Sequence, residues 1–281
     1  MLSRVVARGV PVVAIVLACL PPPAGAEFYG HVAASSVEES NVNGGAPAQS
    51  DSRQALRATA GVRLDMGATG RLTLQADGER ERHAHFRGLD NDALALSARY
   101  RHPIGFGPVA PWLVLRAGIG RRDYDDDPRD TTRVTAGVGL GMPLGPGAEL
   151  EARYDHARER ADAAVFDTAR DEISLEGRAW PTRWLSGWVR VGAATGTSTL
   201  TAASDPALAS AASDSASDPV FGAGFTAYRF DSRERSAGGG LRIELGRAGA
   251  VELSLRRVIV RADGADTYAS TLRSAGWSLH W

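Results

Sequence analysis

Lysine is absent from this 281-residue chain, so all 32 of its Lys and Arg residues are arginine. The formal net charge is −1, which gives no electrostatic reason to expect a nucleic-acid partner. Cysteine occurs once, at Cys19, which excludes an intrachain disulfide. The longest apolar run, Val10 to Leu20, is shorter than the about 20 residues of a membrane-spanning helix. The mean hydropathy of −0.19 by itself favours a soluble protein.

The N-terminus has the organisation of a secretory signal peptide. Arg4 and Arg8 precede the apolar run, and Ala24-Gly25-Ala26 forms a small-x-small cleavage site. We therefore predict that residues 1–26 are removed and that the mature chain, 27–281, contains no cysteine.

A second interpretation begins at the same place. The segment Val16-Leu17-Ala18-Cys19 resembles a bacterial lipobox, in which Cys19 would be lipidated and become the first residue. The leucine before Ala18 fits that pattern poorly, so cleavage after Ala26 is favoured.

The mature chain alternates apolar and polar residues with a period of two. In Leu56–Met66 the apolar residues stand at every second position, and arginine, threonine, glycine and aspartate stand between them. Such alternation predicts strands with one apolar and one polar face. Twelve segments share this pattern: 28–37, 56–66, 72–77, 94–101, 113–122, 134–142, 149–155, 172–179, 187–193, 241–245, 251–259 and 268–281.

The connections between these segments alternate between short, Gly- and Pro-containing turns and longer polar loops. This arrangement predicts an all-β fold, a single antiparallel up-and-down transmembrane barrel of about twelve strands. Residues 196–233 form the longest loop, which is predicted to be extracellular, and its low-complexity part, 196–218, is predicted to lack fixed structure. A two-strand excursion within this loop would give fourteen strands instead.

Aromatic residues are predicted to form two girdles at the membrane interfaces. Those beside the short turns are Trp112, Trp180, Trp184 and Trp281. Those toward the long loops are Tyr124, Phe166, Phe221, Phe225, Tyr228, Phe230 and Tyr268.

The last strand ends on Trp281, with Leu279 and Trp277 alternating behind it. With the signal peptide and the strand pattern, this terminus resembles Gram-negative outer-membrane β-barrel proteins. The resemblance implies an outer-membrane location, contact with lipid and lipopolysaccharide, and Trp277, Leu279 and Trp281 as the signal for the barrel-assembly machinery. In outline the chain is also similar to narrow channels for acidic oligosaccharides.

The strand phases predict a barrel interior with charges of both signs. The candidate lumen-lining residues are Arg57, Arg63, Arg99, Arg101, Arg116, Arg133, Arg153, Arg178, Arg190, Arg242, Arg256, Glu149, Glu151, Glu176, Glu244 and Glu252. Arginine donors match the geometry of carboxylates, which suggests a passive channel or export component for small polar or anionic solutes. The alternative is an internal salt-bridge network in a non-conducting barrel that binds lipopolysaccharide or an envelope partner.

Further arginines stand where strands meet the long loops. Guanidinium groups pair with phosphates, so the candidates for lipopolysaccharide contact are Arg80, Arg82, Arg121, Arg122, Arg158 and Arg160. Aspartates at 123–130 lack the spacing of a calcium loop, and no metal or cofactor is predicted.

An enzyme is the least favoured interpretation. His83 and His85 lie near Asp90 and Asp92 and suggest a lipid hydrolase at the rim, but no nucleophile motif accompanies them. We therefore expect a non-enzymatic, monomeric outer-membrane barrel.

Overall fold

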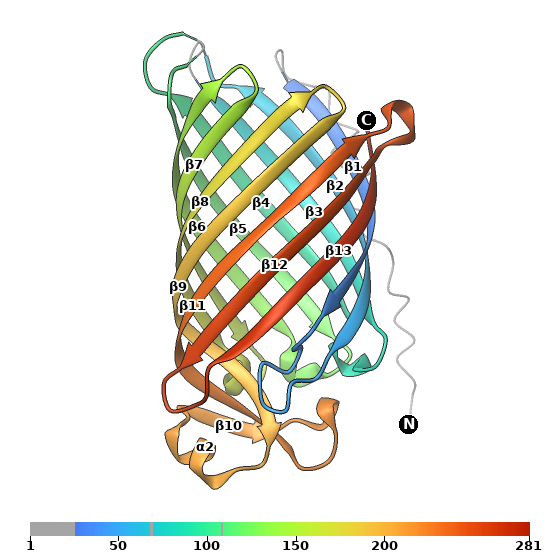
Figure 1. The fold of residues 1–281 in the computed structure, drawn as a ribbon, viewed down its shortest axis with the longest axis vertical. Coiled ribbons are helices and arrows are strands. Elements are labelled where there is room, and N and C mark those ends of the chain that lie inside the picture. The colour runs from blue at the N-terminus through green and yellow to red at the C-terminus, as the bar shows by residue number, and fades with distance from the viewer. Residues whose placement is uncertain (1–25, 68–69, 108) are drawn as a thin grey trace.

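Twelve strands close into one antiparallel barrel in the computed structural model, which describes residues 26–67, 70–107 and 109–281 (Figure 1). The ring contains β1 (Ala26–Glu39), β2 (Asp51–Asp65), β3 (Arg71–His83), β4 (Asn91–Pro103), β5 (Trp112–Tyr124), β6 (Thr131–Gly145), β7 (Ala148–Ala161), β8 (Thr168–Thr182), β9 (Leu185–Ala203), β11 (Phe225–Glu244), β12 (Ala250–Ala262) and β13 (Tyr268–His280). Strand β9 pairs with β11, and β13 pairs with β1 to close the ring. The predicted twelve-stranded barrel is confirmed. Residues 1–25 of the predicted signal peptide, Cys19 included, lie outside the described residues.

Side-chain alternation gives the barrel an apolar outside and a polar inside. Leu140 on β6 is 54 % exposed and Ile173 on β8 is 67 % exposed, although both are large aliphatic residues. Exposing such surface to water costs about 25 cal/mol per Å², so the outer face requires a lipid environment. Closure of the ring leaves no unpaired strand edge within the bilayer.

The two ends of the barrel differ in their connections. The short-turn rim carries the connections 66–70, 104–111, 146–147, 183–184 and 245–249, together with the C-terminus (Figure 1). Gly249 has φ +97°, and a Cβ there would lie 2.0 Å from the carbonyl oxygen of Ser278. The long-loop rim carries the connections 40–50, 84–90, 125–130, 162–167, 204–224 and 263–267.

The longest connection is structured, which differs from the prediction for 196–218. Strand β9 continues to Ala203 because residues 197–203 pair in register with 225–231 of β11. Helix α2 (Pro206–Ala211) follows, with the Asp205 carboxylate accepting the backbone N–H of Ala207 at 2.8 Å. Strand pairing and the capped helix order this segment, although many of its side chains are exposed. We refer to residues 204–224 as the strap.

The strap adds one short strand to the sheet but none to the ring. Strand β10 (Asp214–Ser217) pairs only with the outer part of β11. The fourteen-strand alternative is therefore wrong. Beneath the strap, Leu200, Ala202, Tyr228, Phe230 and Ala262 form a buried cluster.

Only part of the aromatic prediction holds. Trp180, Trp184 and Trp281 are exposed at the short-turn rim, as expected for a girdle. Trp112 is 3 % exposed and lies inside the barrel, because it shares the inward phase of Arg116. At the other rim the predicted girdle is also wrong for six residues. Phe166, Phe221, Tyr228 and Phe230 are buried against the strap or the loops, and Tyr124 and Tyr268 line a cavity inside the barrel.

The C-terminal residue completes the closure between β13 and β1. Trp281 exchanges two backbone hydrogen bonds with Gly30, at 3.0 and 3.1 Å. Its indole ring covers Gly30, where a Cβ would lie 2.4 Å from the ring. Trp277 is exposed and donates its indole N–H to the carbonyl of Ala248 at 2.8 Å. The three residues of the predicted assembly signal, Trp277, Leu279 and Trp281, thus stand at the end of β13 beside the short-turn rim.

Candidate channel lumen

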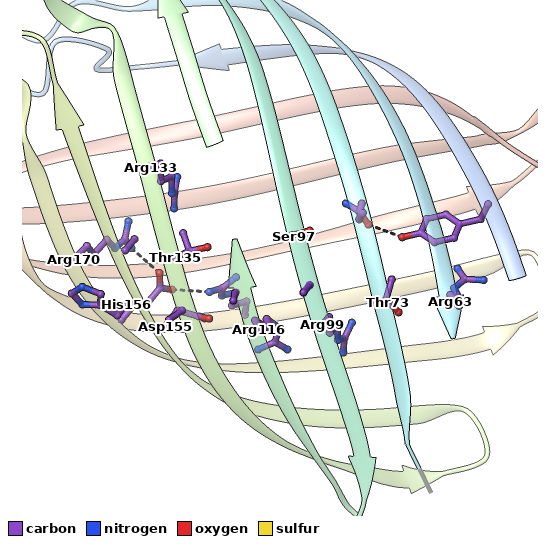
Figure 2. Close-up of a pocket in the computed structure, with 18 of the residues that line it drawn as sticks. Arg63, Thr73, Ser97, Arg99, Arg116, Arg133, Thr135, Asp155, His156 and Arg170 are labelled. Atoms are coloured by element: carbon purple, nitrogen blue, oxygen red, sulfur yellow. Dashed lines mark hydrogen bonds and ion pairs between the residues drawn. The ribbon is translucent and has the colours of Figure 1, made fainter. Parts of the chain in front are cut away.

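A cavity of about 770 Å³ occupies the middle of the barrel (Figure 2). Six of the predicted lumen residues line it: Arg63, Arg99, Arg116, Arg133, Arg190 and Arg256. Arg170 is a seventh arginine of the lining, and the sequence analysis missed it. Asp155 and Glu172 are the acidic residues of the lining.

One wall of the lumen is organised around Glu151. This carboxylate is 3 % exposed and contacts Arg116, Arg153 at 2.8 Å and Arg99 at 3.6 Å. Three guanidinium groups offset the cost of burying one carboxylate, and they tie β4 and β5 to β7. The chain of pairs continues to β8 through Arg153 and Glu176, at 3.1 Å.

A second cluster of ion pairs, on β8, β9, β11 and β12, is organised around Arg170. Its guanidinium lies 3.0 Å from Glu172 and 2.8 Å from Glu234. The same carboxylates also bind Arg190, at 2.8 Å, and Arg256, at 3.4 Å. Glu234 escaped the sequence analysis because residues up to 233 were assigned to a loop and the next strand was begun at 241.

The other predicted lumen residues lie outside this cavity. Ion pairs join Arg57 to Glu79, Arg178 to Glu176 at 2.5 Å and to Glu149 at 3.7 Å, and Arg242 to Glu244 at 2.7 Å. Arg101 lies over the Trp112 ring at 3.9 Å from the ring centre. Glu252 shares the inward phase of Arg256 on β12. Every predicted lumen arginine is therefore held by a carboxylate or a ring.

Pairing does not use up the hydrogen-bond donors of these arginines. Three buried nitrogen atoms lack a hydrogen-bond partner within the described part of the chain: Nε of Arg99, Nη1 of Arg116 and Nε of Arg170. All three residues line the central cavity. A guanidinium carries five N–H groups, so pairing with one or two carboxylates leaves further N–H groups on the arginines that line the cavity. A carboxylate, a hydroxyl-rich solute or water satisfies such donors.

The strap crosses the long-loop end of the barrel. It leaves the ring between β9 and β11, and its Val220 and Phe221 contact Gly88 and Phe86 in the loop between β3 and β4. Six strands separate these two points in either direction round the ring, β11-β12-β13-β1-β2-β3 one way and β9-β8-β7-β6-β5-β4 the other. The two points are therefore opposite each other, and the strap spans the mouth.

A buried ion pair holds the strap in this position. Asp218 is fully buried and contacts Arg129 of the loop between β5 and β6, and it accepts the hydroxyl of Thr201 at 2.6 Å. The Arg129 guanidinium lies 4.1 Å from the centre of the Phe166 ring. Below the strap is a second cavity of about 360 Å³, which shares Arg133 and Arg170 with the central one.

The lumen is filled toward the short-turn rim on one side. Trp112 and Val114 of β5 are buried, and the Trp112 ring covers Gly141, where a Cβ would lie 2.3 Å away. Glycine at 141 therefore leaves the space that the indole occupies.

Replacing Trp112 with alanine is expected to widen the lumen and raise the single-channel conductance. The change also removes the cation–π contact with Arg101, which contributes about 1 kcal/mol. Conductance in planar bilayers and the midpoint of thermal unfolding test both effects. Trp180→Ala, at the exposed short-turn rim, is the control and should leave conductance unchanged.

The predicted outer-rim arginines fall into three groups. Arg80 pairs with Asp92 at 2.7 Å, Arg82 lies 3.7 Å from the same carboxylate, and Arg121 pairs with Asp123 at 2.6 Å. Arg122 does not reach the outer face, because it alternates with Arg121 and donates to Glu79 inside the barrel at 3.4 Å. Arg158 and Arg160 are exposed on the outer side of β7.

The two candidate histidines do not form a nucleophile-activating pair. His83 is 3.7 Å from Asp90 and its side chain is 6 % exposed, whereas the exposed His85 contacts Asp51 at 3.0 Å. Serines 40, 50 and 52 border the same groove as His85, but no hydroxyl of the described residues hydrogen-bonds its ring. In that part of the chain, no three His, Cys, Asp or Glu side chains gather into a possible metal site.

Within the described ranges, no helix has the length and hydropathy to cross a membrane.

No family model matches the chain, and no curated protein does. Among solved structures, an outer membrane channel from Pseudomonas putida F1 has a TM-score of 0.57 at 10 % identity, covering 92 % of this chain and 97 % of that chain. The KdgM porin in complex with disordered oligogalacturonate has a TM-score of 0.46 at 6 % identity, covering 89 % and 98 %. The NanC porin has 0.44 at 8 % identity, covering 88 % and 98 %.

The first of these likenesses establishes a shared fold. Together with the apolar outer face and the polar interior, it defines an integral β-barrel protein with the porin-like fold. The apolar outer face and this fold agree with the outer-membrane location that the sequence predicts.

Proposed function

We propose that the chain is a passive channel for small polar solutes, with a preference for anions. The observation that carries this proposal is the set of seven arginine side chains that line the central cavity, Arg99, Arg116 and Arg170 among them. Donors fixed by ion pairs along the cavity wall can replace the hydration of a solute carboxylate or hydroxyl as it passes. A twelve-stranded ring is wider than the eight-stranded barrels that side chains fill completely.

The charge of the cavity supports a moderate preference rather than an exclusive one. Seven arginines line it, and the acids of the lining and of their ion pairs are Asp155, Glu172, Glu27, Glu151, Glu159 and Glu234. The counts, seven against six, are nearly equal. The net charge is therefore close to neutral, and selectivity arises from donor geometry and from the position of the charges.

Planar-bilayer recordings of the purified protein test the proposal. Discrete conductance steps and a reversal potential of anion sign in a salt gradient are the expected results. If the barrel never conducts at any voltage, with or without the strap, the alternative of a non-conducting barrel with an internal salt-bridge network is supported instead. The pairing of every predicted lumen arginine is the observation that favours this alternative.

Acidity should influence how firmly the strap is held. Burial raises the pKa of Asp126, and Asp218 nearby raises it further, whereas Arg129 at 3.3 Å lowers it. Because the pKa of Asp126 is raised when the strap is in place, this arrangement favours the neutral carboxyl group. The stabilisation of the strap that results is present at low pH and is lost as the pH rises through the raised pKa.

We expect Asp126→Asn to hold the strap more firmly at pH 7.5 and to flatten this part of the pH dependence. The open probability recorded between pH 4 and pH 7.5 is the measurement. Asp127→Asn, in the same loop but more exposed, is the matched control. Greater opening of the Asp126→Asn channel at pH 7.5 would contradict the expectation.

A further inference from the structure

Five exposed arginines gather on the outer face of three neighbouring strands, toward the long-loop rim. These residues, called the basic patch below, are Arg233 and Arg235 on β11, Arg257 and Arg261 on β12, and Arg273 on β13. Their chain neighbours Glu234 and Arg256 pair with each other inside the barrel, so alternation directs the basic patch outward. Among the described residues, none of the five has an ion pair or a hydrogen bond from its side chain.

The strand register brings these like charges together. Arg233 lies directly opposite Arg261, while Arg235 lies opposite Ile259 and is therefore diagonal to Arg257 and Arg261. Arg273 lies opposite Leu255 and is diagonal to Arg257. Like charges opposite each other destabilise a sheet, so the barrel itself gains nothing from this arrangement. A bound anion would convert the repulsion into attraction.

The basic patch differs from the arginines on the other side of the barrel. On β3 and β5, Arg80 and Arg121 are neutralised by Asp92 and Asp123. The acids that border the basic patch are Glu38, which faces Arg273 in register, and Asp231 and Asp263 toward the loops. None of these three carboxylates pairs with an arginine of the basic patch.

An apolar surface adjoins the basic patch on the side away from the loops. Leu241, Leu253 and Leu255 are 54 %, 50 % and 53 % exposed on the same three-strand face. Long loops lie on the outer side of such barrels and short turns on the inner side, so the basic patch stands at the level of the outer-leaflet headgroups. A ligand that covers both surfaces needs anionic groups above and hydrocarbon chains below.

We propose that the basic patch binds the phosphate groups of lipopolysaccharide, with its acyl chains on the leucine surface. The planar guanidinium matches phosphate with two parallel hydrogen bonds and keeps its charge at every physiological pH. Phosphate between Arg233 and Arg261 accounts for a like-charge pair that the fold does not otherwise explain. The proposal is independent of whether the lumen conducts.

The test compares two double variants, Arg233→Gln/Arg261→Gln in the basic patch and Arg80→Gln/Arg121→Gln on the paired side. Each purified barrel is placed in nanodiscs and titrated with lipopolysaccharide, with the same lipopolysaccharide after enzymatic removal of its phosphates, with phosphatidylglycerol vesicles and with inorganic phosphate. We expect wild type and the paired-side variant to bind intact lipopolysaccharide equally, and the basic-patch variant to bind it about tenfold more weakly or worse. Removing the phosphates should cause a similar loss for wild type.

Three results would overturn the proposal. They are equal binding by both double variants, equal binding of the dephosphorylated lipid, or equal binding of phosphatidylglycerol or free phosphate. A charge reversal separates ligand binding from fold stability. Arg233→Glu places opposite charges across the β11–β12 pair, so it should raise the unfolding temperature in detergent while it lowers lipopolysaccharide binding. Weakened binding together with a lowered unfolding temperature would indicate a structural role for Arg233 and contradict the assignment.

Discussion

Replacing the strap with a two-residue Asn-Gly turn is expected to raise single-channel conductance several-fold. The deletion covers residues 204–224, and Ala203 and Phe225 at its ends are direct register partners. A two-residue turn of this type connects such partners without distorting the strands. The reason for the expected increase is geometric, since the strap runs between opposite sides of the mouth above the central cavity. Conductance equal to that of the full chain would show that the strap lies outside the conduction path.

The opposite manipulation locks the strap in place. A Cβ at Gly88 would lie 3.4 Å from the Cβ of Val220, close to the separation of about 3.5–4.5 Å found in disulfides. Gly88→Cys/Val220→Cys should therefore cross-link when oxidised, and the mature chain offers no competing cysteine if Cys19 leaves with the signal peptide. We expect low conductance in the oxidised channel and recovery on reduction.

A single substitution provides a milder form of the same test. Asp218→Asn removes the buried partner of Arg129 and leaves it only the Asp126 carboxylate at 3.3 Å. Breaking a buried ion pair costs about 3–5 kcal/mol where the remaining charge is unpaired, and Asp126 offsets part of this cost. The open probability of the channel should therefore rise, while the conductance of the open state stays unchanged. Asp214→Asn removes the same charge from the strap at a position that makes no ion pair within the described structure, and it should behave like wild type.

The barrel could be predicted from sequence because alternation is a local signal that every strand repeats. Strand phase alone placed Arg99, Arg116 and Glu151 on one face, and the structure brings these three side chains into contact. Strand phase also predicts that Trp112 faces inward with Arg116. The opposite prediction was made because an aromatic residue beside a turn suggests a membrane girdle.

The strap and the ion pair between Arg170 and Glu234 could not be predicted in the same way. Ala- and Ser-rich composition indicates weak hydrophobic driving force, but residues 197–203 gain their order from pairing with 225–231, a long-range contact that composition does not report. Arg170 and Glu234 stand beyond the predicted strand ends, so their meeting at 2.8 Å depends on how far β8 and β11 extend past the bilayer. Strand length, rather than strand phase, was the missing quantity.

The second large effect concerns ion selectivity. Arg190→Gln/Arg256→Gln removes two charges from the cavity wall, and both of their carboxylate partners, Glu172 and Glu234, keep Arg170 at 3.0 Å or less. The fold should therefore tolerate the change without a buried, unpaired carboxylate. A unit charge about 8 Å from a passing anion contributes roughly 0.5 kcal/mol even at the dielectric constant of water. Two such charges amount to about 1 kcal/mol, so the anion-to-cation permeability ratio should fall about fivefold.

The control for this variant must remove the same charge from the lumen without touching the cavity. Arg57→Gln/Arg178→Gln meets that condition, because neither residue lines the two lumen cavities. Their nearest carboxylate partners keep other arginines, Glu79 with Arg122 and Glu176 with Arg153, and only the more distant Glu149 loses its arginine. Salt screens such effects within about 10 Å at 0.1 M and about 3 Å at 1 M. The loss of selectivity should therefore be largest at low salt and nearly vanish at 1 M. If the two double variants lose selectivity equally, it depends on the total charge of the barrel, and the central cavity is not the selective site.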